Sequence, residues 1–414
     1  MIDRYNETME SEFLPLIKST MANNQRKSGG HFYTVPSDRA YPYQWLWDSC
    51  WHALIYSYYQ PELAEKEIET LLTKQWENGM VPHVIYWERD HDVYPVDWGV
   101  DTNTTTLIQP PVIAYTALRI FEKTSNTDWL QRIFPKLVKW HEYLARERQL
   151  PNRNIYGIIN PDESGEDNSP RFDIALDLPP IHDVEENQKK RFALFDVHKQ
   201  NAFKANQGTH EHFWVEDVPF NIFTLESVRS LSRIAEILGD QTKSDQLLQQ
   251  ADQTAEDLRR YCFSDGVFLS AMGPSQPLIE VDTWAHFAPL FAGLYSPEEA
   301  SELIDKYFNS PRHFSTPFSI PTVSQSDEAY APTEPDFGQP WQHPHWRGPI
   351  WMVVNWCVYQ GLKRYGFNEE AAKLKTSTEE LIRKSGMREY YHPETGQGMG
   401  ADRFTWAGLI LDMN

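Results

Sequence analysis

The sequence contains little cysteine and no long apolar run. Its three cysteines, Cys50, Cys262 and Cys357, are widely spaced and form no CxxC pair. An odd number of isolated cysteines argues against a disulfide framework and predicts reduced thiols. The start lacks a basic region followed by an apolar segment, and no stretch approaches the ~18 apolar residues of a membrane span. We therefore predict a cytoplasmic protein that does not bind or cross a membrane.

Positive charge is also scarce, with 38 Lys and Arg against 59 Asp and Glu and a net charge of −21. Nucleic acids and anionic membranes are bound by clustered Lys and Arg, so this balance argues against both as partners. The chain lacks a phosphate-binding glycine loop and a dinucleotide fingerprint, and we predict no cofactor. The expected partner is a small molecule, and the oligomeric state is left open, with a homo-oligomer among the alternatives.

Two histidine pairs have the spacing of metal ligands, but nothing completes a site around them. They are "HEH", with His210 and His212, and "HPH", with His343 and His345. Structural zinc sites need further Cys or His ligands, and metalloprotease sites need an HExxH helix. We therefore predict no metal.

Aromatic residues and helical periodicity are what the sequence has in abundance. Aromatics make up 14% of the 414 residues, with 15 Trp and 20 Tyr. In the segment 127–148, apolar residues recur three and four positions apart, which predicts an amphipathic helix. A similar spacing predicts helices at 3–22, 44–58, 61–75, 106–123, 221–239, 242–262, 281–295, 297–309, 347–364, 367–385 and 403–412. The fold class is therefore all-α.

The connections alternate between short and long. Short turns near 59–60, 124–126, 240–241, 296 and 365–366 alternate with long excursions near 23–43, 76–105, 149–220, 263–280, 310–346 and 386–402. Antiparallel hairpins place all long excursions at one end of the helices. We predict one domain, 1–414, forming a closed α/α barrel of about six hairpins with the active-site loops on one face. An open solenoid would show a sequence repeat, and none is visible.

The long excursions combine aromatic rings with carboxylates and amides. Examples are "YPYQWLWDSCWH", "DTNTTTLIQPP", "ESGEDNSPRFD" and "QPWQHPHWRGPIW". Aromatic faces stack on the C–H faces of sugars, while sugar hydroxyls require paired hydrogen-bond donors and acceptors. Cleavage of a glycosidic bond needs one carboxylic acid and one carboxylate on opposite sides of the bond. These excursions therefore predict a carbohydrate site.

Four motifs together resemble glycoside hydrolase family 63 and its trehalase relatives. They are "WLWDS", "ESGEDNSPR", "WRGPIW" and "REYYHPETGQG", in this order across nearly the whole chain. The resemblance implies an α/α-barrel α-glycosidase that inverts the anomeric centre, with small bacterial members that cleave hexosyl-glycerate solutes. It places the general acid on Asp167 and the general base on Glu389. Without the resemblance, either residue could be an ordinary loop carboxylate.

Further substrate-binding candidates follow from the same motifs. Asp48 is expected to accept sugar hydroxyls, although it could equally belong to a helix start. Gln109 and Arg347 are expected in the sugar subsite, and Arg347 could instead pair with a catalytic acid. Glu163 is expected to support the acid loop, with Asp162 and Glu166 further from the substrate. The remaining candidates are Arg171, the possible stacking residues Trp45, Trp47 and Trp346, and the wall residues Tyr43, Tyr86 and Tyr390.

The acid cluster also carries an electrostatic prediction. Crowding Glu163, Glu166 and Asp167 disfavours full ionisation, so the least compensated group keeps its proton and can act as the acid. Glu389, next to Arg388, is expected to stay ionised and to act as a base on water.

The same charges bear on the substrate. Asp162 and Glu166 would repel an anionic aglycone, with Arg171 as the only nearby arginine in the segment. This favours a neutral aglycone and predicts glucosylglycerol. Glucosylglycerate and mannosylglycerate are the alternatives, if Arg171, Lys204 or Arg347 receives a carboxylate. Two other classes stay open: a sugar epimerase or isomerase that uses the histidines at 343, 345 or 392, and a carbohydrate-binding barrel without activity.

Overall fold

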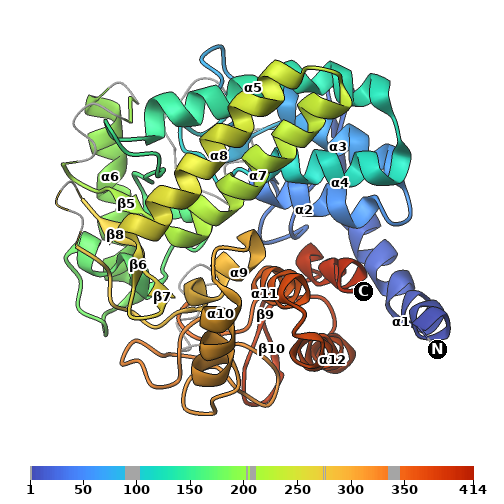
Figure 1. Ribbon diagram of the computed structural model, residues 1–414. Helices are drawn as coiled ribbons and strands as arrows, with labels where there is room; N and C mark the ends of the chain where they lie inside the picture. Colours follow the sequence, from blue (N-terminus) through green and yellow to red (C-terminus); the bar gives the residue numbers. More distant parts are fainter. Residues whose placement is uncertain are drawn as a thin grey trace.

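Most of the protein is helical (Figure 1), which confirms the helical class. The computed structural model describes residues 2–88, 103–201, 204–205, 211–273, 275, 277–333 and 346–414. Among the described helices, none combines the length and apolar character needed to cross a lipid bilayer. All three cysteines are buried free thiols.

The α-helices are α1 (Ile2–Asn24), α2 (Leu46–Tyr56), α3 (Pro61–Thr73), α4 (Ile113–Thr124), α5 (Thr127–Arg148), α6 (Val184–Gln200), α7 (Val218–Ile237), α8 (Gln241–Tyr261), α9 (Ala288–Ala292), α10 (Pro297–Leu303), α11 (Met352–Tyr365) and α12 (Asn368–Ser385). Shorter helical elements are η1 (Pro161–Ser164), η2 (Pro170–Phe172), η3 (Ile174–Leu176), η4 (Trp284–His286), η5 (Ile304–Phe308) and η6 (Thr405–Asp412).

Short antiparallel strand pairs, which the helical pattern did not predict, occupy the long connections. They are β1 (Gln25–Ser28) with β2 (His31–Thr34), β3 (Gln44–Trp45) with β4 (Val84–Ile85), β5 (Val215–Glu216) with β8 (Ala271–Met272), β6 (Phe263–Ser264) with β7 (Val267–Phe268), and β9 (Arg388–Tyr391) with β10 (Gly398–Asp402). These pairs satisfy backbone groups that would otherwise be left unpaired in long buried loops.

Local signals explain where several helices begin and end. Ser296 and Glu299 form the expected capping box of α10, and Gly366 ends α11 in the left-handed conformation. Proline explains two differences from the predicted bounds. Pro110 and Pro111 prevent an earlier start of α4, which begins at Ile113. The predicted helix 281–295 consists only of η4 followed by α9, which has Pro289 in its first turn. Helix α6 was missed because its apolar residues do not form a stripe.

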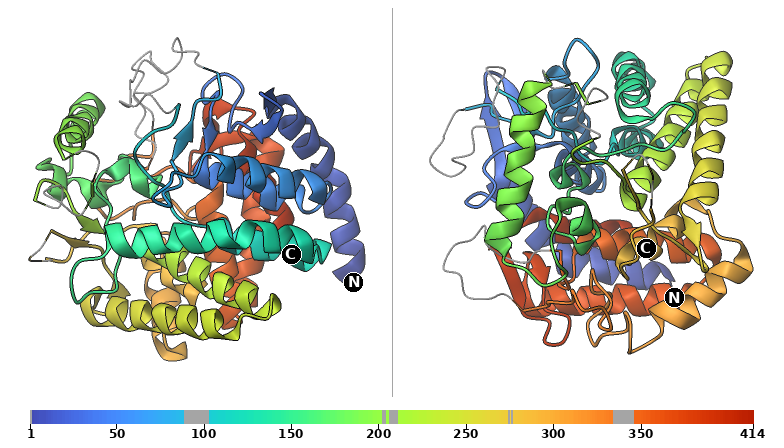
Figure 2. Two further views of the ribbon diagram at one scale, coloured as in Figure 1. Left: turned by 90° about the horizontal axis from the view of Figure 1, so that it is seen from above. Right: turned by 90° about the vertical axis from the view of Figure 1, so that its left-hand side faces the viewer.

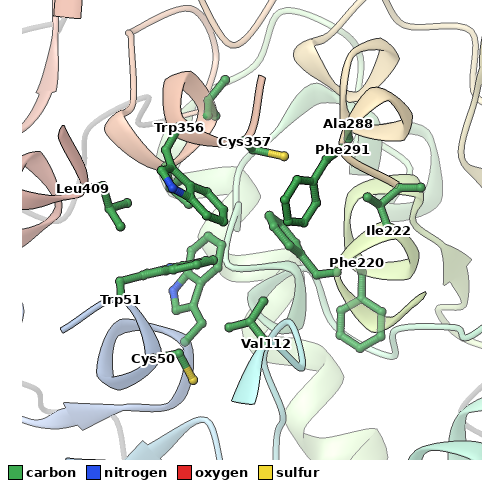
Figure 3. Close-up of a cluster of buried hydrophobic side chains, with 14 of the residues drawn as sticks. Cys50, Trp51, Val112, Phe220, Ile222, Ala288, Phe291, Trp356, Cys357 and Leu409 are labelled. Carbon is green, nitrogen blue, oxygen red and sulfur yellow. The ribbon is translucent and has the colours of Figure 1, made fainter. Parts of the chain in front are cut away.

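Six of the described elements form the interior. Helix α2 packs against α4, α4 against α7, α7 against α9, α9 against α11, α11 against η6, and η6 against α2. Helices α3, α8 and α12 pack against α2, α7 and α11 respectively, farther from the centre (Figures 1 and 2). Figure 3 shows buried side chains from these interior elements meeting in one core, among them Trp51, Phe291 and Trp356.

The interior elements set the position of the site. The segments that follow their C-terminal ends are short, at 57–60, 125–126, 238–240, 293–296 and 366–367. The long segments precede their N-terminal ends and contain three of the sequence motifs, and the fourth, "WLWDS", runs from the end of such a segment into α2. Helix α6 lies in the longest of these segments, at the edge of the molecule opposite to α1 (Figure 1).

Candidate active site

The loop that carries Asp167 is held in a fixed conformation by tight packing. Gly165 has a φ of 74°, and a Cβ there would lie 2.4 Å from the Trp47 ring, so only glycine fits. The turn is closed by the backbone N–H of Ser169, which donates to the Glu166 carbonyl at 2.8 Å. The Asp167 side chain is 31% exposed, whereas Glu166 next to it is buried. The loop therefore presents Asp167 and turns Glu166 inward.

Glu163 is buried and hydrogen-bonded within the protein. Its carboxylate accepts hydrogen bonds from the backbone N–H groups of Ile108 (3.1 Å) and Ile159 (2.9 Å). Arg148, at the end of α5, donates to it at 2.6 Å. Burial raises the pKa of Glu163, while Arg148 and the two N–H groups oppose that shift. Glu163 thus connects the acid loop to two other chain segments.

Glu166 is bound on both carboxylate oxygens. Arg171 donates to them at 3.0 and 2.9 Å, and the Trp284 indole N–H donates to Oε2 at 2.8 Å. The Nε of Arg171 also donates to Asp217, the N-cap residue of α7, at 2.9 Å. Burial raises the pKa of Glu166, and Arg171 opposes the shift. The guanidinium of Arg171 is therefore buried between two protein carboxylates.

Arg191 of α6 contacts the two remaining carboxylates of the loop. Its Nη1 lies 3.1 Å from Asp167 Oδ2 and also pairs with Asp162 Oδ1. Burial raises the pKa of Asp162 to about 6, opposed by Arg191 and reinforced by the charge of Asp167. Arg171 is the only nearby arginine within the motif segment, as the sequence indicated, but α6 brings a second one, Arg191, to the acid loop from farther along the chain.

Glu389 lies on β9 and is also oriented by two hydrogen bonds. The Tyr41 hydroxyl donates to Oε1 at 2.7 Å, and the Ala401 N–H donates to Oε2 at 2.7 Å. Arg388 donates instead to the Gly400 carbonyl at 3.0 Å. Gly400 has a φ of 62°, and a Cβ there would lie 2.5 Å from Glu389 Oε2. The carboxylate thus has a defined orientation.

Glu389 borders a cavity of about 610 Å³. Its lining also includes Tyr41, Arg388, His392 and Gln397. Pockets of ~300–1,000 Å³ are typical for small ligands. The base candidate therefore lies beside a polar space large enough for a small molecule.

Asp48 occupies the first turn of α2. It accepts a hydrogen bond from the Trp406 indole N–H at 2.8 Å. Burial raises the pKa of Asp48 to about 8; the Trp406 bond opposes the shift, and the charge of Glu389 adds to it. Gln109 lies beside the same helix start, where its Oε1 accepts from the Trp47 N–H at 3.2 Å. Asp48 and Glu389 are thus electrostatically coupled.

Tryptophans fill the space between the acid loop and β9. Trp346 stacks on Trp351 with ring centres 3.9 Å apart, and its backbone N–H donates to Asn168 of the acid loop at 3.0 Å. Trp47 meets Trp406 edge to face at 5.0 Å. Trp351 lies 5.1 Å from Tyr390, the neighbour of Glu389. These rings connect the two segments that carry the candidate acid and base.

The other predicted residues take up wall and framework positions. Tyr43 and Tyr86 pack edge to face at 4.9 Å, and Trp45 packs against His83 at 5.1 Å. Tyr390 is fully buried. Arg347 pairs with Asp173 at 3.0 and 2.8 Å.

Histidines offer no metal site in the part of the chain that the structure describes. No group of three His, Cys, Asp or Glu residues among the described residues could hold a metal ion. His210, His343 and His345 lie outside the described residues, whereas His212 lies within them. His392 accepts a hydrogen bond from the Glu394 N–H at 3.1 Å and lines the cavity beside Glu389.

Sequence reasoning missed Tyr41, Arg191, Trp351 and Trp406. Tyr41 and Trp351 stand inside or beside motifs that were already singled out, so their positions offered a signal. No signal in the sequence marked Trp406 or Arg191, because their contacts depend on how η6 and α6 pack.

Residues 41–407 match the family described as mannosylglycerate hydrolase MGH1-like glycoside hydrolase domain. A mannosylglycerate hydrolase from Thermus thermophilus is 32% identical, covering 93% of this chain and 97% of that protein. A glucosylglycerate hydrolase from Mycolicibacterium hassiacum is 27% identical, covering 92% of this chain and 93% of its own length.

Solved structures of other proteins also resemble this chain. The crystal structure of a GH63 mannosylglycerate hydrolase from Thermus thermophilus in complex with Tris and D-glycerate superposes with a TM-score of 0.83 at 29% identity, covering 96% of this chain and 98% of that one. Neutral trehalase from Saccharomyces cerevisiae shares the fold, with a TM-score of 0.59 at 15% identity over 93% of this chain and 73% of the trehalase chain. The chain therefore belongs to the MGH1-like family of glycoside hydrolases, within glycoside hydrolase family 63, and is a glycoside hydrolase.

Proposed function

We propose that this protein is an inverting α-glycosidase that hydrolyses an α-hexosyl glycerate, namely mannosylglycerate or glucosylglycerate. The observation that carries the proposal is the similarity to mannosylglycerate and glucosylglycerate hydrolases, which extends over more than nine tenths of the chain. This similarity outweighs the charge argument, which favoured the neutral substrate glucosylglycerol.

The contacts of the acid loop weaken the charge argument for a neutral aglycone. That argument weighed Asp162 and Glu166 against Arg171 as the only nearby arginine of the segment. Asp162 pairs with Arg191, and Glu166 pairs with Arg171. Two unit charges 4 Å apart interact by about 4 kcal/mol at an effective dielectric of 20, so each arginine cancels most of the repulsion from its partner. An anionic aglycone near Asp167 then meets less repulsion than two uncompensated carboxylates would cause.

In the proposed mechanism, Asp167 donates a proton to the leaving oxygen while Glu389 takes a proton from the attacking water. Its partly exposed side chain allows Asp167 to reach a bound glycoside. The bonds from Tyr41 and Ala401 orient Glu389 and leave lone pairs on both oxygens for water. We expect the two carboxyl groups to stand ~6.5–9.5 Å apart, the separation typical of inverting enzymes.

The remaining candidates divide into two roles. We assign sugar contact to Asp48 and Gln109 and to the aromatic residues Tyr43, Trp45, Trp47, Tyr86 and Trp346. Glu163, Arg171 and Arg347 are held in buried ion pairs, and Tyr390 is completely covered and packs on Trp351, so we assign these four to the framework of the site.

We also infer that the chain forms one domain, a closed α/α barrel. Six interior elements each pack against the next, and the last, η6, packs against the first, α2. This cyclic order supports closure. It also gathers the segments that carry Asp48, Asp167 and Glu389 at the N-terminal ends of the interior elements.

The proposal is tested by supplying mannosylglycerate, glucosylglycerate and glucosylglycerol at equal concentration and moderate salt. We expect higher kcat/KM for one of the two glycerates than for glucosylglycerol, and ¹H NMR should show the β-anomer of the free sugar first. A higher kcat/KM for glucosylglycerol would restore the neutral aglycone. Release of no free sugar from any of the three would contradict the proposed substrate class, and initial release of the α-anomer would contradict inversion.

A further inference from the structure

The residues on either side of Asp167 are both bound by other parts of the protein. Before it, Glu166 is held by Arg171 and by the indole N–H of Trp284. After it, the Asn168 side-chain oxygen accepts from the Trp346 backbone N–H at 3.0 Å, and its carbonyl accepts from Arg347 Nη1 at 3.2 Å. We propose that Asp167 is positioned through these two neighbours, with Glu166 and Asn168 as positioning residues.

The groups that hold Glu166 and Asn168 come from different regions of the chain. Trp284 belongs to η4, which precedes α9, while Trp346 and Arg347 precede α11. Arg347 is itself fixed by Asp173, which follows η2, and Arg171 is fixed by Asp217 at the start of α7. The position of Asp167 therefore depends on three interior helices.

Burial supports a positioning role for Glu166. Its side chain is 2% exposed and both carboxylate oxygens accept hydrogen bonds within the protein. Such a group has no open path to a substrate. Because Glu166 points inward from the loop, tethering it also fixes the direction of Asp167 on the other side. Displacing a reacting group by ~1 Å can lower the rate ~10²-fold, so these tethers matter for turnover.

The chain provides a matched control in Glu216. Like Glu166, it is a buried glutamate paired with one arginine, since Arg153 Nε donates to its two oxygens at 2.8 and 2.9 Å. Burial raises the pKa of both glutamates, and the paired arginine opposes both shifts. Glu216→Gln therefore measures what the loss of such a pair does to folding alone.

The experiment compares Glu166→Gln, Asn168→Ala and Glu216→Gln, with the melting temperature measured for each. It rests on the proposed role of Asp167, so Asp167→Asn is assayed beside them. We expect the first two to lower kcat ~10–10²-fold on the preferred glycoside with KM within ~3-fold, and Glu216→Gln to leave kcat within ~2-fold at a similar loss of melting temperature.

A second substrate separates misplacement of the acid from general damage. The α-hexosyl fluoride of the same sugar releases fluoride, which needs little protonation, so an enzyme with a displaced acid should still cleave it. We expect Glu166→Gln and Asn168→Ala to keep at least half of wild-type kcat on the fluoride.

Two results would overturn the proposal: a loss on the fluoride equal to that on the glycoside, or more than half of wild-type kcat on the glycoside in either positioning variant. If Glu166→Gln fails to fold, Trp284→Phe removes one tether without altering charge and is judged by the same criteria. Activity retained by Asp167→Asn on the glycoside would instead refute the general acid itself, and with it the reason for positioning that residue.

Discussion

Asp167 and Glu389 differ in how the protein surrounds them. Asp167 is partly exposed and contacts one arginine, whereas Glu389 is buried and receives two hydrogen bonds. We expect Asp167→Asn and Glu389→Gln each to lower kcat by ~10²–10⁴-fold, because each removes one proton transfer. Thermal melting and substrate binding by calorimetry should stay close to wild type. Either variant with more than a third of wild-type activity would refute its assigned role.

Asp48 predicts a pH dependence of stability. Its pKa of about 8 in the folded protein exceeds the ~4 expected in the unfolded chain. Between these values the folded state holds a proton that the unfolded state has lost, so this group stabilises the fold below pH ~4 and loses that contribution as pH rises through about 8. Asp48→Asn removes this dependence. We expect the melting temperature of wild type to fall more steeply from pH 5 to pH 9 than that of the variant, and parallel curves would contradict the raised pKa.

At the residue scale, the sequence indicated which residue types form the site better than it indicated which charged residues pair with each other. Motifs placed carboxylates, tryptophans and amides around one site, because sugar chemistry needs those residue types close together. They did not show that Arg148 and Arg191 pair with carboxylates of the acid loop, since these partners come from α5 and α6. The proposed substrate changed because of the similarity to glycerate hydrolases, and these pairs weaken the charge argument against it.

Helix α6 shows what periodicity misses at the element scale. Its apolar residues form no stripe, so it was taken as part of a long excursion. The structure shows Phe195 in a small apolar cluster with Leu107, and Arg191 at the acid loop. A helix with little core surface can still place one functional side chain, and such helices are hard to find from hydrophobic spacing.

Arg191 allows a test of what α6 contributes to specificity. Arg191→Gln removes the charge that offsets Asp162 beside the general acid. We expect kcat/KM for the glycerate substrate to fall ~10–10²-fold more than kcat/KM for glucosylglycerol, since an unpaired Asp162 would repel a nearby carboxylate by about 2 kcal/mol at an effective dielectric of 20. Arg191→Lys keeps the charge and should retain most of the discrimination. Equal losses on the two substrates would show that Arg191 supports only the fold of the loop.

Helix ends could be predicted better than the long loops between them. Capping residues such as Ser296 and Gly366 act over a few positions, so sequence alone located those helix ends. The long segments depend on contacts between residues far apart in the sequence, such as Tyr41 with Glu389. Their strand pairs and the unexpected α6 follow from packing that no local pattern records.

At the scale of the whole molecule, the interior elements have two distinct ends. Their N-terminal ends carry Asp48, Asp217 and Trp406, where partial positive charges of helix termini favour carboxylates. At the other end, Asp412 joins several elements. It accepts from Arg119 of α4 at 2.9 Å, from the Trp356 indole of α11 at 2.8 Å, and from the hydroxyl of Tyr58 after α2.

Asp412 should therefore affect stability without affecting turnover. Asp412→Asn removes a buried charge with an arginine partner, and we expect it to lower the free energy of unfolding by ~2–4 kcal/mol, since Arg119 is partly exposed and the full cost of breaking a buried pair is ~3–5 kcal/mol. Tyr58 lies about 10 residues beyond Asp48, or ~15 Å along a helix, so kcat and KM of the folded variant should match wild type. Urea unfolding measures the first quantity, with the exposed Asp252→Asn as control. Unchanged stability would mean that Asp412 does not hold these helices together, and a lower kcat in the folded variant would mean that the two ends of the interior elements are coupled.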